Sequence, residues 1–166
     1  MDTEKKPKSF LASLFHRGAL IQTGIFVILA IVIFYGICIP IRINENGMDP
    51  AYRSGQLNFC WRPRFWFSDL HRFQVVIIKV PGRRQMLIRR IVGLPNEVVD
   101  IRKGGVYINN LLLDEPYLEH PCEWDARPTK VPRDGIFVIG DNRDVPSDKA
   151  MFGQVSKDCV IGAPLW

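Results

Sequence analysis

The clearest feature of the pattern of hydrophobic and polar positions is one long apolar run near the N-terminus. No charged residue lies between Arg17 and Arg42. At about 1.5 Å per residue, residues 18–41 form about 36 Å of helix, enough for a hydrocarbon core of about 30 Å. The run therefore predicts a transmembrane helix. A buried core helix would need partner helices, which the later sequence lacks, and a cleaved signal peptide would be shorter and end in small residues.

Beyond Arg42 the pattern changes to short apolar runs separated by turn residues. The expected strands are residues 74–80, 86–92, 98–102, 106–109, 136–139 and 155–161. The pair Asn109-Asn110 is typical of a hairpin turn. Because no long amphipathic helix follows the apolar run, residues 42–166 are predicted to form a mostly-β domain, of Greek-key or barrel type.

Composition excludes two broad classes of protein. The chain is 47% hydrophobic, which is typical of folded proteins, and 23% charged, which argues against several membrane spans. The arm formed by residues 1–17 is basic through Lys5, Lys6, Lys8 and Arg17. By the positive-inside rule this arm lies in the cytoplasm and residues 42–166 lie outside.

Three cysteines, Cys60, Cys122 and Cys159, fall in the exported part. Their wide spacing contains no CxxC or CxxH pattern, so we expect neither a metal site nor a cofactor. At most one disulfide can form among three thiols, none is required, and buried free cysteines are the preferred interpretation.

Charge is unevenly distributed over the exported part. Residues 42–103 hold 12 basic and 5 acidic residues, whereas residues 104–166 hold 6 basic and 10 acidic ones. An exported domain rarely meets nucleic acid, so attraction to anionic lipid headgroups is preferred for the basic half, with a solvated basic face as the alternative. The segment 57–70 places tryptophan and phenylalanine beside arginine, which is typical of a membrane interface or of ordinary core aromatics.

Three stretches carry the most specific pattern. They are Asn46-Gly47-Met48-Asp49-Pro50, Arg89-Arg90 followed by IVGLPNE, and Gly140-Asp141-Asn142-Arg143-Asp144. With the N-terminal anchor, their order and spacing resemble the bacterial type I signal peptidases, the S26 family. The resemblance reaches from the anchor to about Ile161. It implies a signal-peptidase-like antiparallel β domain with a small cap at about residues 104–132, anchored in the bacterial cytoplasmic membrane by one helix.

The resemblance also implies a site that has lost its chemistry. In the family a serine attacks the scissile carbonyl and a buried lysine takes its proton. The serine position corresponds to Gly47, the lysine position to Arg89, and the position of a serine that orients the lysine to Pro146. Glycine has no nucleophile, arginine is not deprotonated in proteins, and proline has no side-chain donor or acceptor. The chain is thus expected to lack the catalytic dyad.

Other positions of the same motifs are kept as a framework. They are Met48, Pro50, Arg90, Gly93, Pro95, Gly140, Asp141, Asn142 and Asp148. A buried arginine in a vacated site is costly unless it is paired. The hypothesis is that Arg89 bridges to Asp148 and fills the former dyad pocket.

Two classes of function follow, with a third as an alternative. An inactive homologue would bind a secreted precursor or signal peptide, a pilin-like subunit or an active signal peptidase, by adding a peptide strand to the β domain. An active peptidase would need rearranged residues. The candidates are Ser54, Ser147 and a pair of His71 or His120 with Ser68 or Ser54, whereas Lys79 resembles an ordinary lysine of the family and not its base. A lipid-surface module is favoured only by the aromatic and basic segment 57–70. Membrane lipid is an expected partner in every case, and nucleic acid is not.

Overall fold

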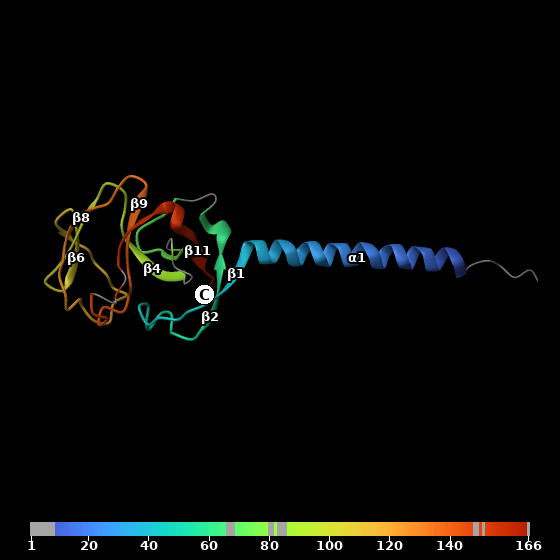
Figure 1. Ribbon diagram of the computed structural model, residues 1–166, viewed down its shortest axis with the longest axis horizontal. Coiled ribbons are helices and arrows are strands. Elements are labelled where there is room, and N and C mark those ends of the chain that lie inside the picture. The colour runs from blue at the N-terminus through green and yellow to red at the C-terminus, as the bar shows by residue number, and fades with distance from the viewer. Residues whose placement is uncertain are drawn as a thin grey trace, which may run out of the picture. The chain divides into compact units, whose positions relative to one another are not determined.

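The computed structural model describes residues 9–65, 69–79, 82, 86–147, 150 and 152–165. The chain divides into two compact units, residues 1–37 and 38–166, which are described separately. The first unit contains one helix, α1 (Ser9–Ile37) (Figure 1). Its part Gly18–Ile37 has a mean hydropathy of 2.5 and is not buried by other parts of the protein. By length and composition this helix is suited to cross a membrane.

The helix ends earlier than the apolar run predicts. Strand β1 (Cys38–Arg42) follows α1 directly, so residues 38–41 of the expected span are strand and not helix. Pro40 gives the physical reason, because proline cannot donate a backbone hydrogen bond and drives the preceding residue toward an extended conformation.

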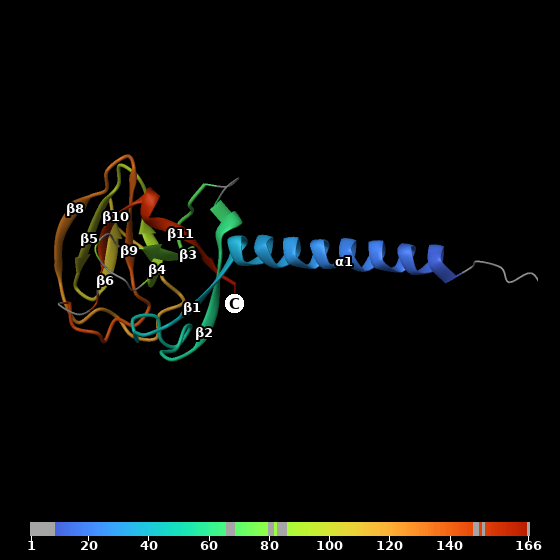
Figure 2. The ribbon, with the colours of Figure 1, turned by 45° about the vertical axis from the view of Figure 1, so that its right-hand side comes forward.

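The second unit consists of two antiparallel sheets (Figure 2). The larger has the strand order β1-β2-β11-β3-β4-β9-β10 and the smaller has the order β7-β6-β5-β8. The remaining strands are β2 (Leu57–Trp61), β3 (Val75–Lys79), β4 (Met86–Gly93), β5 (Val98–Arg102), β6 (Gly105–Ile108), β7 (Leu111–Leu112), β8 (Ala126–Lys130), β9 (Gly135–Ile139), β10 (Gly153–Ser156) and β11 (Val160–Pro164). Two short 3-10 helices, η1 (Arg62–Phe65) and η2 (Lys157–Cys159), complete the elements.

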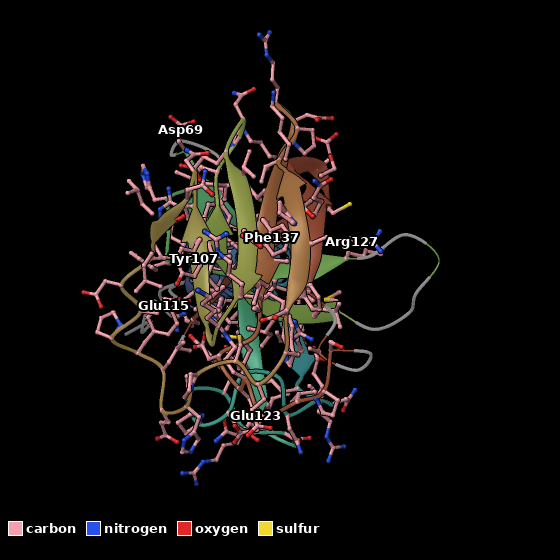
Figure 3. All side chains as sticks on the ribbon, turned by 90° about the vertical axis from the view of Figure 1, so that its left-hand side faces the viewer. Asp69, Tyr107, Glu115, Glu123, Arg127 and Phe137 are labelled. Carbon is pink, nitrogen blue, oxygen red and sulfur yellow. The ribbon has the colours of Figure 1, made fainter. Side chains whose placement is uncertain are left out.

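Strand β3 is buried on both faces, which explains its β-branched run. Ile77 packs with Ile88 and Met48 in one apolar cluster, while Val76 and Ile78 belong to another cluster. A third cluster joins the two sheets, because it combines β9 residues such as Phe137 with residues of β5 and β6. Figure 3 shows Phe137 among the strands near the centre of the domain.

The mostly-β prediction is confirmed, with one wrong strand. Residues 98–102 form a strand as expected. Asn109 and Asn110 have φ angles of 51° and 69°, and a two-residue type I′ hairpin turn requires positive φ at both positions. The expected single strand 155–161 is instead divided into β10, η2 and β11. Ser156 is the reason, because its side chain caps η2 by accepting a hydrogen bond from the Asp158 amide.

Candidate functional site

The first and third sequence motifs lie against each other. The Gly47 carbonyl accepts a hydrogen bond from the Asn142 backbone amide at 3.1 Å. The Asn142 side-chain amide donates to the Asn46 carbonyl at 3.0 Å. The loop that follows β1 is therefore bound to the loop that follows β9, which brings residues almost a hundred positions apart into one site.

Gly140 makes this close approach possible. A β-carbon at Gly140 would lie 2.1 Å from the Gly47 carbonyl oxygen, a distance at which the loop would have to move. Gly93 has an equivalent role between the sheets, because a β-carbon there would lie 2.4 Å from a methyl group of Val99 and 2.8 Å from the Phe137 side chain. Both glycines are thus required by close packing, Gly140 against the backbone of Gly47 and Gly93 against side chains.

Arg89, on β4, is buried beside Gly47. Its side chain is 1% exposed. A β-carbon at Gly47 would lie 3.0 Å from Nη1 of Arg89 and 3.2 Å from both Cζ and Nη2. The guanidinium also donates to the Ile88 carbonyl at 2.6 Å and to the Ala150 carbonyl at 3.3 Å. The guanidinium therefore fills the space next to Gly47 that a side chain at that position would need.

The charge of Arg89 is paired with Glu45. Nη1 donates to Oε1 at 2.9 Å and Nη2 donates to Oε2 at 2.8 Å, which is a bidentate pair. The Glu45 side chain is 25% exposed. Asp148, the partner expected from the sequence, lies outside the described residues, and the described partner is Glu45. Glu45 lies just before the Asn46–Pro50 motif, and the sequence analysis did not single it out.

Arg90, the next residue on β4, faces a different carboxylate. Its Nε donates to Asp141 Oδ1 at 2.8 Å and its Nη2 to Oδ2 at 2.5 Å. Nη1 donates to the Phe73 carbonyl at 2.8 Å, and the guanidinium lies 4.1 Å from the centre of the Tyr117 ring. Burial opposes the charge, but the hydrogen bond and the charge of Asp141 hold the pKa of Arg90 above its ordinary value. Arg90 thus fastens β4 to the loop after β9.

A third arginine, Arg143, ties the same loop to the segment after β7. Its Nη2 donates to Glu115 at 2.6 Å, its Nε to the Gly140 carbonyl at 2.7 Å and its Nη1 to the Cys122 sulfur at 3.2 Å. The Tyr117 hydroxyl donates to Glu115 at 2.5 Å. Burial and the hydrogen bond to Glu115 raise the pKa of Tyr117, and burial raises the pKa of the Cys122 thiol. In this network the positive charge of Arg143 is paired with the negative charge of Glu115, and both side chains are buried.

Comparison with known proteins places these motifs in one family. The family described as "Signal peptidase, peptidase S26" matches residues 17–165. The chain belongs to this family. Its match spans the apolar helix, both sheets and all three motifs of the candidate site.

Several curated relatives carry the name signal peptidase I. Signal peptidase I of Leptolyngbya laminosa is 38% identical over 147 residues, which cover 84% of this chain and 72% of that protein. Signal peptidase I of Bacillus licheniformis is 29% identical over 171 residues, or 96% and 91% of the two chains. A solved structure of signal peptidase I from Enterococcus faecalis V583 matches 58% of this chain and 97% of its own, with 28% identity and a TM-score of 0.47.

Some of the other framework positions lie near Gly47, one lies elsewhere, and Asp148 lies outside the described residues. Met48 is buried in the cluster with Ile77. Pro50, Asp141 and Asn142 line a cavity of about 220 Å³. Pro146 is exposed, and its carbonyl accepts from the Ala150 amide at 2.9 Å. Pro95 lies in the turn after β4, away from this cavity on the lining of another one.

The candidates for a rearranged peptidase site lie at the surface where the structure describes them. Ser54, His71, Lys79, His120 and Ser147 are all exposed, and Ser68 lies outside the described residues. Among the described residues no group of three or more His, Cys, Asp and Glu is arranged to hold a metal ion. Free thiols are found at Cys38, Cys60, Cys122 and Cys159.

Proposed function

We propose that this signal peptidase relative is a membrane-anchored protein that binds exported precursors or surface-structure subunits without cleaving them. The observation that carries the proposal is the contact between Arg89 and Gly47. Where the family uses a nucleophile and a base, this chain has a residue without a side chain and a cation that cannot accept a proton. The guanidinium lies 3.0 Å from where a β-carbon of residue 47 would be.

The position of Glu45 is a second argument that the site does not cleave peptides. It holds the guanidinium in a bidentate pair at 2.8 and 2.9 Å. A lysine at position 89 would meet the same carboxylate, which would favour its charged form and oppose its use as a base. Restoring a serine and a lysine would therefore leave a third obstacle in the site.

Binding without cleavage needs a place for an extended peptide. Within the described residues, β10 pairs with β9 and forms an edge of the larger sheet. An edge strand offers unpaired backbone groups to which a peptide strand can add. Strand β9 leads into the loop in which the Asn142 amide donates to the Gly47 carbonyl. A peptide added at β10 would therefore lie on the sheet that carries the candidate site.

A cleavage assay tests the proposal. The full chain, purified in detergent, is incubated with a preprotein that carries an Ala-x-Ala cleavage site, next to Bacillus licheniformis signal peptidase I as the positive control. We expect cleavage by the control and none by this chain. The triple variant Glu45→Ala, Gly47→Ser and Arg89→Lys, which restores the dyad and removes the carboxylate, is expected to gain activity.

An active peptidase is the second candidate, favoured by the names of the relatives. The same assay decides between the two. Cleavage by the unmodified chain that is abolished by Ser54→Ala or by Ser147→Ala would overturn the proposal and identify the replacement nucleophile. Co-purification from the native membrane then identifies the bound class: a secreted subunit supports a holding function, and an intact signal peptidase supports a regulatory one.

A further inference from the structure

The Arg89 site already holds a carboxylate. Both oxygens of Glu45 accept from the two terminal nitrogens of the guanidinium. The same two nitrogens also donate to the backbone carbonyls of Ile88 and Ala150, which help to orient the plane of the group. A planar, oriented guanidinium is a specific receptor for a carboxylate, because the two groups match in a fork of parallel hydrogen bonds.

The two partners differ in how they are held. Arg89 lies on β4 with 1% of its side chain exposed, whereas 25% of the Glu45 side chain is exposed. Glu45 belongs to the segment 43–45, which has no regular secondary structure. Glu45 is therefore the more exposed partner of the pair, and it lies on a segment without regular structure, whereas Arg89 is buried on a strand.

We propose that Arg89 is a receptor for the C-terminal carboxylate of a peptide, and that Glu45 is its resident, displaceable ligand. This inference rests on the proposed function, since it names the ligand class of the same site. Hydrolysis of a peptide bond gives the released N-terminal fragment a new carboxylate at its C-terminus. In this chain the cation lies against Gly47, so the site suits a chain that ends there, either a released fragment or the C-terminus of an intact surface-structure subunit.

Competition by Glu45 sets the expected strength of binding. A tethered ligand acts at an effective concentration on the order of millimolar, so a free peptide must compete against it. Removal of Glu45 should therefore strengthen binding of a peptide acid. A C-terminal amide carries no charge and cannot replace the carboxylate of the pair.

The experiment measures binding of two peptides that differ only at the C-terminus. A fluorescein-labelled hexapeptide ending in alanine, as the free acid and as the C-terminal amide, is titrated into the full chain in detergent. We expect Glu45→Ala to bind the acid about tenfold or more tightly than it binds the amide, and about tenfold more tightly than the unmodified chain binds the acid. The acid, and not the amide, should raise the melting temperature of this variant.

Two further measurements keep the result decisive. Glu45→Gln keeps the volume of the side chain and replaces Glu45→Ala in the titration if the alanine variant does not fold. The unmodified chain, titrated with millimolar peptide, should still prefer the acid. The double variant Glu45→Ala with Arg89→Met, which removes both charges, should lose the preference. Equal binding of acid and amide by the single variants and by the unmodified chain would overturn the inference, as would a preference that survives in the double variant.

The outcomes separate this inference from the proposed function. If the acid is not preferred while the preprotein stays uncleaved, only the carboxylate receptor is refuted. If the unmodified chain cleaves the preprotein, the proposed function is refuted whatever the peptides do.

Discussion

Gly47 and Arg89 each limit what the other position can hold. The guanidinium is fixed by Glu45 and by backbone carbonyls, so it has little freedom to move away from residue 47. Any side chain at residue 47 would press against it from 3.0 Å. The two positions are therefore coupled through space, and a substitution at one changes the effect of a substitution at the other.

This coupling predicts that the effect of Gly47→Ala on stability depends on the residue at position 89. Gly47→Ala should destabilise the unmodified chain by about 1 kcal/mol, because overpacking costs about 1–3 kcal/mol and the reduced freedom of the unfolded chain offsets part of it. In the Arg89→Lys background the guanidinium is absent, so the same substitution should be neutral or stabilising. A double-mutant cycle measured by thermal unfolding of the full chain checks this. Strictly additive effects of the two substitutions would contradict the coupling.

Cys60 gives the molecule a predictable response to alkaline pH. Burial raises the pKa of its thiol to about 11, against 9.0 for an ordinary thiol. The unfolded state therefore loses the proton first, and stability that is present below pH 9 is lost as the pH rises from 9 to 11. The free energy of unfolding should fall by on the order of 2 kcal/mol over this interval because of this group.

The contribution of Cys60 is isolated by substitution. Cys60→Ala should lower stability at neutral pH but give a flatter decline between pH 9 and 11 than the unmodified chain. The matched control is Cys159→Ala, which removes a partly exposed thiol. Thermal unfolding at a series of pH values measures both, and parallel pH profiles for the Cys60 variant and the unmodified chain would refute the assignment.

At the scale of elements, ion pairs fasten the loops of the site to the sheets. Arg90 connects β4 with the loop after β9, and Arg143 connects that loop with Glu115 in the segment after β7. The side chains of Arg143 and Glu115 are 1% and 5% exposed. Removing one member of a buried pair leaves an uncompensated charge, which costs far more than losing a pair at the surface.

Glu115→Ala is thus expected to be among the more damaging substitutions in the smaller-sheet region. It leaves Arg143 unpaired and removes the acceptor of the Tyr117 hydroxyl, for a loss of about 3–5 kcal/mol. Arg102→Ala is the control, because its pair with Asp100 is partly exposed, and it should cost about 1 kcal/mol. Thermal unfolding of the full chain gives both values, and similar losses for the two variants would show that burial of the pair contributes little.

The same elements show what the sequence could and could not predict. Strand β3 could be predicted, because a strand that is buried on both faces has a continuous run of apolar, β-branched residues. Strand β8 was missed, since its sequence ARPTK lies at a sheet edge and is largely exposed. The motif positions of the site could be identified by resemblance. The pair between Arg89 and Glu45 could not, because its members are 44 residues apart and meet only through the tertiary structure.

At the scale of the whole molecule, the side of the membrane decides which proteins can meet the site. The chain combines an apolar helix with a β domain that belongs to the signal peptidase family. A site for exported peptides is useful only if residues 42–166 lie outside the cytoplasm. The charge of the flanks predicts this orientation, because Lys5, Lys6, Lys8 and Arg17 precede the apolar run.

This orientation predicts the activity of topology reporters. Alkaline phosphatase fused after the last residue of the chain should be active, because its disulfides form outside the cytoplasm, and a fusion directly after Arg17 should be inactive. The matched variant replaces Lys5, Lys6 and Lys8 with serine. Since it removes most of the positive charge before the helix, it should lower the active fraction of the full-length fusion without removing the helix itself. The reverse pattern, an inactive full-length fusion that becomes active in the serine variant, would place the β domain in the cytoplasm, where exported precursors would meet it only before translocation.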